Sequence, residues 1–318
     1  MTIKNTFLTA SIASFALCLV SSLTVCTLCH AAMPIGVSIP PQKNLVERIG
    51  GEHVDVTVLL PAGSDPHTFE PKPSQLRDMA KVQLYISIGM PFEDAWLPRL
   101  TEVSNGAVRI VPMHEKLVMP EHAAPAHDPN ATASATASAT ASDGHDHSKC
   151  GGPNDPHRWL SPMLMRHMGL EIRKALVKAD PENAPSYRAN YRKLAQELAD
   201  LDAKLDHILS QLPEDRRRFM VFHPAWLYFA NSYNLEEIAI EVDGREPSPK
   251  QLMKIIDTAR EYDMKAIFIQ PQFSKRAAET IAKEIGNGVQ LMEADPLAED
   301  WAQGIEKLAH QLVESNAQ

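Results

Sequence analysis

The sequence has little cysteine for a chain of 318 residues. There are four, and Cys18, Cys26 and Cys29 all lie close to the amino terminus. If that segment is removed on export, as argued below, Cys150 alone remains and no intramolecular disulfide can form. The mature fold must then be held by its apolar core, even in an oxidising compartment.

Long apolar runs and basic clusters are also scarce. Apart from residues 7–25, no segment approaches the ~20 apolar residues that span a bilayer. The formal charge is −9 at pH 7, and no stripe of Lys and Arg is present to neutralise phosphates, which disfavours nucleic acid as a partner. The His-Glu-x-x-His pattern of helical zinc proteases is absent too.

The amino-terminal segment has the pattern of an export signal. Lys4 supplies a positive start, residues 7–25 are almost free of charge, and small residues follow where cleavage would occur. We therefore expect residues 1–32 to be a signal peptide and the mature chain to be periplasmic. A lipid anchor on Cys26 or Cys29 is disfavoured, because the residue before each is a poor one to precede a lipidated cysteine.

Beyond this segment, strand-like and helix-like stretches alternate, which is typical of βαβ units and parallel sheets. The expected strands are 34–39, 54–60, 84–88 and 108–111, followed later by 219–222, 237–240, 266–269 and 289–292. Between the two groups, residues 186–212 carry apolar side chains at alternating steps of four and three, the stripe of an amphipathic helix about 40 Å long. We predict an α/β protein with two parallel-sheet lobes joined by this long helix.

The same patterns suggest where the lobes begin and end. We expect an N-terminal lobe at 33–182, the linking helix at 183–213 and a C-terminal lobe at 214–318. Residues 119–152 interrupt the first lobe with an Ala, Thr and Ser repeat that has nothing to bury, so we expect this insertion to be disordered. Its histidines are His122, His127, His145 and His147.

Three other histidines lie directly beside a proline: His67, His157 and His223. Asp295 also precedes a proline, and proline presents such side chains from stiff turns. His67, His223 and Asp295 each follow a predicted strand. Open α/β sheets bind ligands at the carboxyl ends of their strands. Three neutral imidazoles and a carboxylate suit a tetrahedral zinc site, although copper and nickel accept the same donors. We predict a metal site in the cleft between the lobes, with two ligands from each.

The strings around these residues carry a resemblance to a known family. They read Asp65-Pro-His-Thr-Phe-Glu-Pro, Asp155-Pro-His-Arg-Trp-Leu-Ser-Pro and Val221-Phe-His-Pro-Ala-Trp. They closely resemble the metal receptors among the solute-binding proteins that serve ATP-driven importers of zinc and manganese, in particular the zinc branch with its long helical backbone. The resemblance covers essentially the whole mature chain. It implies His67, His157, His223 and Asp295 as metal ligands, and a membrane permease as partner.

Within that family, the residue at position 223 separates the metals. Manganese receptors resemble this chain elsewhere but have Glu there, and manganese favours oxygen donors. His223 therefore implies Zn²⁺, with a manganese or iron receptor as the alternative. The family often shows Glu-Pro-Gln-Phe where this chain has Gln270-Pro-Gln-Phe, so an additional oxygen ligand is not expected at Gln270. Some zinc receptors also carry a disulfide that this mature chain cannot form.

The insertion resembles the acidic, His-rich loop of zinc receptors. We expect it to be a weak metal-binding loop that raises the zinc concentration near the cleft, as a tethered weak site does. The alternative is a solvated linker whose histidines accumulated by repeat expansion.

Two other classes of function compete with a receptor. In a zinc hydrolase, the three histidines would hold the metal and Asp295 would act as base for a bound water, but no nucleophile motif supports it. A metal-dependent adhesin is the other class, and no residue pattern encodes its receptor surface. We therefore expect a zinc receptor, monomeric and without enzymatic activity.

Overall fold

The computed structural model describes residues 31–117, 155–241, 245, 247–286 and 288–316. The expected signal peptide lies almost entirely outside these residues, and so do His122, His127, His145 and His147. None of the helices in the described ranges is both long enough and apolar enough to cross a bilayer.

The first parallel sheet has the strand order β2-β1-β3-β4. Its strands are β1 (Met33–Val37), β2 (Val54–Val58), β3 (Leu84–Ser87) and β4 (Arg109–Pro112). The helices that connect them are α2 (Pro40–Gly50), α3 (Pro73–Met79) and α4 (Pro91–Val103), with a short 3₁₀ turn at Gly51–His53. Each of these α-helices has a proline in its first turn, where a missing N–H costs nothing.

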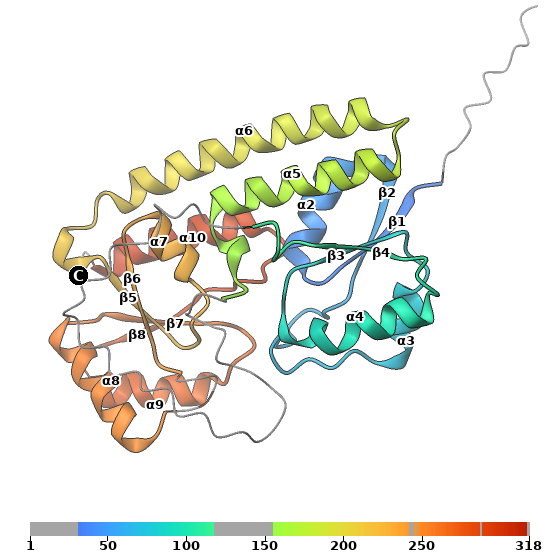
Figure 1. Cartoon of the computed structure of the whole chain (residues 1–318). Coiled ribbons are helices and arrows are strands. Elements are labelled where there is room, and N and C mark those ends of the chain that lie inside the picture. The colour runs from blue at the N-terminus through green and yellow to red at the C-terminus, as the bar shows by residue number, and fades with distance from the viewer. Residues whose placement is uncertain (1–30, 118–154, 242–244, 246, 287, 317–318) are drawn as a thin grey trace, which may run out of the picture. The chain divides into compact units, whose positions relative to one another are not determined.

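The second sheet repeats this arrangement with the order β6-β5-β7-β8, again all parallel. Its strands are β5 (Arg218–Val221), β6 (Glu236–Ala239), β7 (Ala266–Ile269) and β8 (Gln290–Glu293). Its helices are α7 (Leu227–Ser232), α8 (Pro249–Glu261), α9 (Lys275–Ile285) and α10 (Trp301–Asn316) (Figure 1). The predicted class, α/β with two parallel-sheet lobes, is confirmed.

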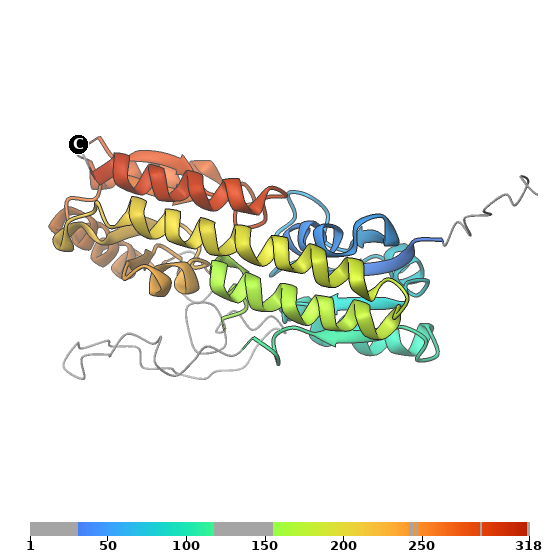
Figure 2. The ribbon, with the colours of Figure 1, turned by 90° about the horizontal axis from the view of Figure 1, so that it is seen from above.

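Two long helices lie between the sheets in sequence, α5 (Pro162–Ala179) and α6 (Ala184–Leu209). The apolar stripe predicted for α6 is buried at Tyr187, Leu194 and Leu205, among others. Helix α6 packs against α2 of the first lobe, against α5, and against α10 of the second lobe (Figure 2). Its 26 residues make a rod of roughly 39 Å, which ends slightly earlier than the apolar stripe does.

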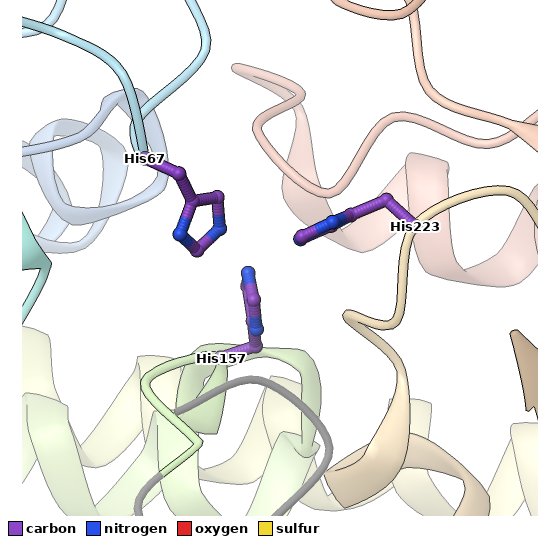
Figure 3. A group of neighbouring side chains, drawn as sticks. All are labelled: His67, His157 and His223. Atoms are coloured by element: carbon purple, nitrogen blue, oxygen red, sulfur yellow. The ribbon is translucent and has the colours of Figure 1, made fainter. Parts of the chain in front are cut away.

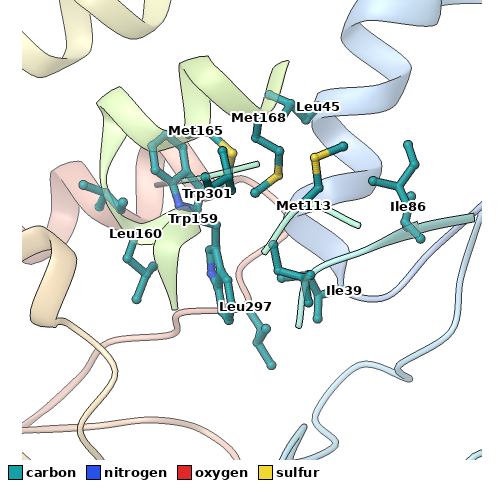
Figure 4. Packing of buried hydrophobic residues seen from close by; sticks show 14 of the residues in the cluster. Ile39, Leu45, Ile86, Met113, Trp159, Leu160, Met165, Met168, Leu297 and Trp301 are labelled. Atoms are coloured by element: carbon teal, nitrogen blue, oxygen red, sulfur yellow. The ribbon is translucent and has the colours of Figure 1, made fainter. Parts of the chain in front are cut away.

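One hydrophobic core runs through both lobes. It includes Ile39 near the first sheet, Met168 on α5, Trp159, and then Leu297 and Trp301 beside and on α10 (Figure 4). A second, smaller core lies in the C-terminal lobe and is shared by β5, β7, α8 and α9. Because the larger core is continuous, the lobes cannot separate widely without exposing apolar surface to water.

A buried carboxylate lies at the carboxyl edge of the first sheet. Glu93 is only 1% exposed and accepts hydrogen bonds from the backbone N–H groups of Ile88 (3.0 Å) and Gly89 (2.6 Å). The hydroxyl of Ser38 also donates to it, and that hydroxyl lies 2.8 Å from the hydroxyl of Tyr85. Burial outweighs these bonds and raises the pKa of Glu93 to about 7.

Glu93 should make the stability of the protein fall as the pH rises. Its pKa is higher in the folded chain than in the unfolded one, so its stabilising contribution is complete below about 4.5 and is lost as the pH rises through 7. We expect the unfolding free energy of wild type, relative to Glu93→Gln, to drop by on the order of 2 kcal/mol between pH 5 and pH 8. Urea unfolding of both proteins at the two pH values measures this drop, and parallel pH dependences would contradict it.

Candidate metal centre

Three imidazoles from distant parts of the chain converge on one point (Figure 3). The ring centroids lie 5.4 Å apart for His67 and His157, 4.7 Å for His67 and His223, and 5.6 Å for His157 and His223. One nitrogen of each ring lies within 4.8 Å of the others. Nitrogens around a tetrahedral zinc with bonds of ~2.0–2.1 Å are about 3.3 Å apart, so small ring movements would close a shell.

His67 and His157 each belong to a local turn of the same kind, with the sequence Asp-Pro-His. Oδ1 of Asp65 accepts the backbone N–H of His67 at 2.9 Å, and Oδ1 of Asp155 accepts that of His157 at 2.7 Å. An aspartate that bonds the N–H two residues onward, with a proline between, makes a stiff turn. The turn explains why these histidines follow proline.

Carboxylates also orient two of the rings. Nδ1 of His157 donates to Asp155 at 2.8 Å, and Nδ1 of His223 donates to Glu241 at 2.5 Å. Each bond places the ring proton on Nδ1 and leaves the lone pair of Nε2 for a metal, as is usual for metal-binding histidines. The sequence gives a signal for Asp155, which stands two residues before a ligand, but none for Glu241, which is 18 positions from His223.

The ring of His223 is suited to bind a metal ion. Its Nε2 is buried and has no hydrogen-bond partner among the described residues. Burial is the largest influence on the pKa of His223 and lowers it. The hydrogen bond to Glu241 acts in the opposite direction, and the nearby His157 ring lowers the pKa by a smaller amount. A neutral ring with an unshared, buried lone pair suits a soft to borderline cation such as Zn²⁺.

The rings face a small cavity. Its volume is about 10 Å³, which holds roughly one water-sized sphere. Besides the three histidines it is lined by Asp65, Pro66, Trp159, Gln270, Gln272, Phe273, Pro296 and Leu297. The ring of Phe273 stacks on His223 at 5.1 Å, and Trp159 lies 5.1 Å from His157. The aromatic and apolar part of this lining lowers the local dielectric, which strengthens the attraction between a cation and its ligands.

Asp295 lies beside this cavity and is not a member of the three-histidine group. Its Oδ1 accepts the backbone N–H of Leu297 at 2.9 Å and the side-chain N–H of Gln272 at 3.4 Å. Asp295-Pro296-Leu297 therefore repeats the Asp-Pro-X turn of the two histidines, with leucine in the third place. Both of its hydrogen-bond partners line the cavity, so the carboxylate is adjacent to it, and its role as fourth ligand stays a prediction.

The turn that carries His157 is also tied to the C-terminal lobe. The indole N–H of Trp159 donates to the backbone oxygen of Pro296 at 2.8 Å, and the hydroxyl of Tyr228 donates to that of Asp155 at 3.2 Å. These bonds join the short segment before α5 to the turn of Asp295 and to α7. The three-histidine group thus lies where segments from both lobes meet.

Comparison with known proteins shows which family the chain belongs to. A family model described as ZnuA, the periplasmic component A of the zinc-uptake complex, matches residues 35–315. The chain is 38% identical to a zinc-bound ZnuA deletion mutant of known crystal structure, with a TM-score of 0.75, and the match covers 90% of this chain and 98% of that one.

Two curated relatives differ in the metal that they are named for. The high-affinity zinc uptake system protein ZnuA of Bacillus subtilis is 27% identical over 77% of this chain and 73% of its own length. The manganese-binding lipoprotein MntA of Halalkalibacterium halodurans is also 27% identical, over 76% of this chain and 72% of its own. The chain therefore belongs to the ZnuA family, the periplasmic metal-binding receptors of zinc-uptake complexes.

Proposed function

We propose that this chain captures Zn²⁺ outside the cytoplasm and delivers it to the membrane permease of an ATP-driven importer. His67, His157, His223 and Asp295 would bind the ion, which is the cargo of the protein and not a cofactor. The observation that carries the proposal is the convergence of three buried imidazoles on one small cavity, where the Nε2 atom of His223 has no hydrogen-bond partner in the part of the chain that the structure describes.

The donor set supports zinc over manganese. Three imidazoles supply nitrogen, and two nearby carboxylates, those of Asp155 and Glu241, accept the Nδ1 protons of the rings. Manganese favours an oxygen-rich shell of higher coordination number, while zinc accepts four donors and a nitrogen-rich shell. Four protein ligands would leave no open position for a catalytic water, so we propose a carrier and no enzyme.

Release would need only a modest movement. The continuous core and the long helix α6 hold the two lobes together, so a wide hinge opening would expose buried apolar surface. We propose that the ion leaves when one ligand turn shifts, a small displacement at the meeting point of the lobes. The mature, exported chain would act as a monomer, and its His122, His127, His145 and His147 would hold zinc loosely near the cleft.

Native mass spectrometry in the presence of competing metals tests this function. The mature chain, from about residue 33, and a variant without residues 119–152 would each be offered equal concentrations of Zn²⁺, Mn²⁺, Fe²⁺, Ni²⁺ and Cu²⁺ salts. We expect one tightly bound zinc in both proteins, because the ligands lie outside the insertion. His223→Glu should shift the preference towards manganese, since it exchanges a nitrogen donor for an oxygen donor.

The proposal would be wrong if the wild-type chain retained manganese over zinc at equal free concentrations, or if removal of the insertion abolished the tight site. Uptake of zinc by cells that carry the importer, with and without this chain, then tests delivery.

A further inference from the structure

The turn that carries His157 is docked on the second lobe, although α5 and α6 separate it from that lobe along the chain. The hydroxyl of Tyr228, on α7, donates to the backbone oxygen of Asp155 at 3.2 Å. Beside this bond, the guanidinium of Arg158 lies 5.8 Å from the centre of the Tyr228 ring, close enough for a cation–π attraction. Tyr228 and Asp155 are both buried, so water competes little for the bond between them.

Further contacts extend this docking along the segment. The hydroxyl of Ser232, at the end of α7, donates to the hydroxyl of Ser161 at 3.1 Å. The indole N–H of Trp159 donates to the backbone oxygen of Pro296, in the turn after β8. Residues 155–161 therefore contact the second lobe at both ends and in the middle.

The bond from Tyr228 matters for the metal because Asp155 orients the ring of His157. Oδ1 of Asp155 accepts both the backbone N–H and the Nδ1 proton of His157, at 2.7 and 2.8 Å. A shift of the Asp155 backbone would move this carboxylate and turn the ring away from the ion. Tyr228 is not among the residues that line the cavity, so it acts on the ring through Asp155.

The same helix is joined to His223. A short turn leads from His223 into α7, and one carboxylate oxygen of Glu237, on β6, accepts the backbone N–H groups of Ala225 (3.0 Å) and Trp226 (2.9 Å) in that turn. These bonds hold the start of α7 against the second sheet. One short helix is thus tied to His223 and to the turn of His157.

The turn that carries His67 is held from the first lobe instead. The ring of Phe69 packs at a right angle on the ring of Phe92, on α4, with centroids 5.4 Å apart. At the base of the same loop, the side chain of Gln75, on α3, donates to the backbone oxygen of Leu59 at 2.9 Å. These contacts come from helices of the first lobe.

We propose that Tyr228 is a positioning residue that docks the His157 turn on the second lobe, so that His157 and His223 form one pre-assembled part of the site and His67 completes it from the first lobe. Asp295, the predicted fourth ligand, would belong to the pre-assembled part. Zinc would then leave when the His67 turn withdraws. This inference rests on the proposed function, since it concerns the same site, but the docking exists without metal and can be tested separately.

Tyr228→Phe is the test variant, because it removes the hydroxyl and keeps the buried ring. Tyr191→Phe is the matched control. The hydroxyl of Tyr191, on α6, donates to the backbone oxygen of Arg166, on α5, at 3.3 Å, and neither residue lines the cavity. Each variant loses one bond from a tyrosine hydroxyl to a backbone oxygen, so we expect small decreases in the melting temperatures of both metal-free proteins.

Docking is measured on the metal-free proteins by hydrogen–deuterium exchange of the peptide that covers residues 155–161. We expect about fivefold faster exchange in Tyr228→Phe, because one hydrogen bond no longer opposes local opening. Nitrogen NMR should also show that His157 loses its preference for the Nδ1–H tautomer in this variant, a signature that a loss of stability alone would not produce. Tyr191→Phe should match wild type in both measurements. Unchanged exchange in Tyr228→Phe, or equal acceleration in the control, would overturn the positioning role.

The division of the site is measured by the exchange of residues 61–72 and 155–161 with and without Zn²⁺. In wild type, we expect zinc to slow exchange about tenfold in residues 61–72 and less than about twofold in residues 155–161, which are already docked. In Tyr228→Phe, zinc should protect both segments, and zinc affinity should fall about tenfold. Equal protection of both segments in wild type would overturn the division. A wild type without tight zinc would refute the proposed function, and the metal-free comparison would still decide the docking.

Discussion

Alanine at both His67 and His157 should abolish tight zinc binding and leave the fold intact. Structural zinc sites with four protein ligands contribute ~10–16 kcal/mol, or about 3 kcal/mol for each ligand, so the loss of two should weaken binding on the order of 10⁴-fold. The rings line the cavity, and their loss removes no side chain of the apolar core, so we expect the variant to fold. Competition with a chelator of known affinity measures the loss.

The matched control is the double variant His114→Ala with His167→Ala. Both of these side chains are exposed, at 43% and 41%, and neither belongs to the three-histidine group. Circular dichroism and the melting temperature of the metal-free proteins report the fold. Tight zinc binding that survives in the His67 and His157 double variant would remove this cavity from consideration as the binding site.

Glu241→Ala should weaken zinc binding by about 10–100-fold, although Glu241 itself would not touch the ion. Its carboxylate accepts the Nδ1 proton of His223 at 2.5 Å, which fixes both the tautomer and the angle of the ring. Without it, the ring can rotate and can carry its proton on Nε2, the atom that the metal needs. Zinc competition measures the affinity, and nitrogen NMR of the imidazole reports the tautomer.

Glu236→Ala is the control for this experiment. Glu236 begins strand β6, two residues beyond whose end Glu241 lies, but the side chain of Glu236 is 58% exposed and pairs with Arg218 on the surface, where ion pairs contribute little. If Glu241→Ala bound zinc as tightly as Glu236→Ala, or kept the wild-type tautomer, the orienting role of Glu241 would be excluded.

The sequence was most informative about the elements that a helical period or a proline turn defines locally. The stripe that includes Tyr187, Leu194 and Leu205 predicted the long helix, and the structure buries these side chains along α6. Boundaries were less accurate: the stripe continues to Leu212, but the helix ends at Leu209. Leu212 stays buried at 5% exposure, because the turn before Pro213 still packs it against the core.

The candidate site was predicted in part. His67, His157 and His223 do converge, and their common feature in the sequence, a neighbouring proline, reflects the stiff turns that present them. For Asp295 the same feature is ambiguous, since its Oδ1 closes the turn to Leu297. An aspartate before proline serves as a turn acceptor or as a metal ligand, and the sequence pattern is the same for both.

By itself, the sequence determined the α/β class, the long helix, the resemblance to metal receptors and the three candidate histidines, because strand alternation, helical periodicity and proline turns are local properties of the chain. Only the tertiary structure decided that Glu241 orients the ring of His223, that the side chain of Gln270 donates a hydrogen bond to the backbone oxygen of His223, and that one core runs through both lobes. These contacts join residues far apart along the chain, and they depend on which loops meet at the carboxyl ends of the strands. No spacing in the sequence encodes that meeting.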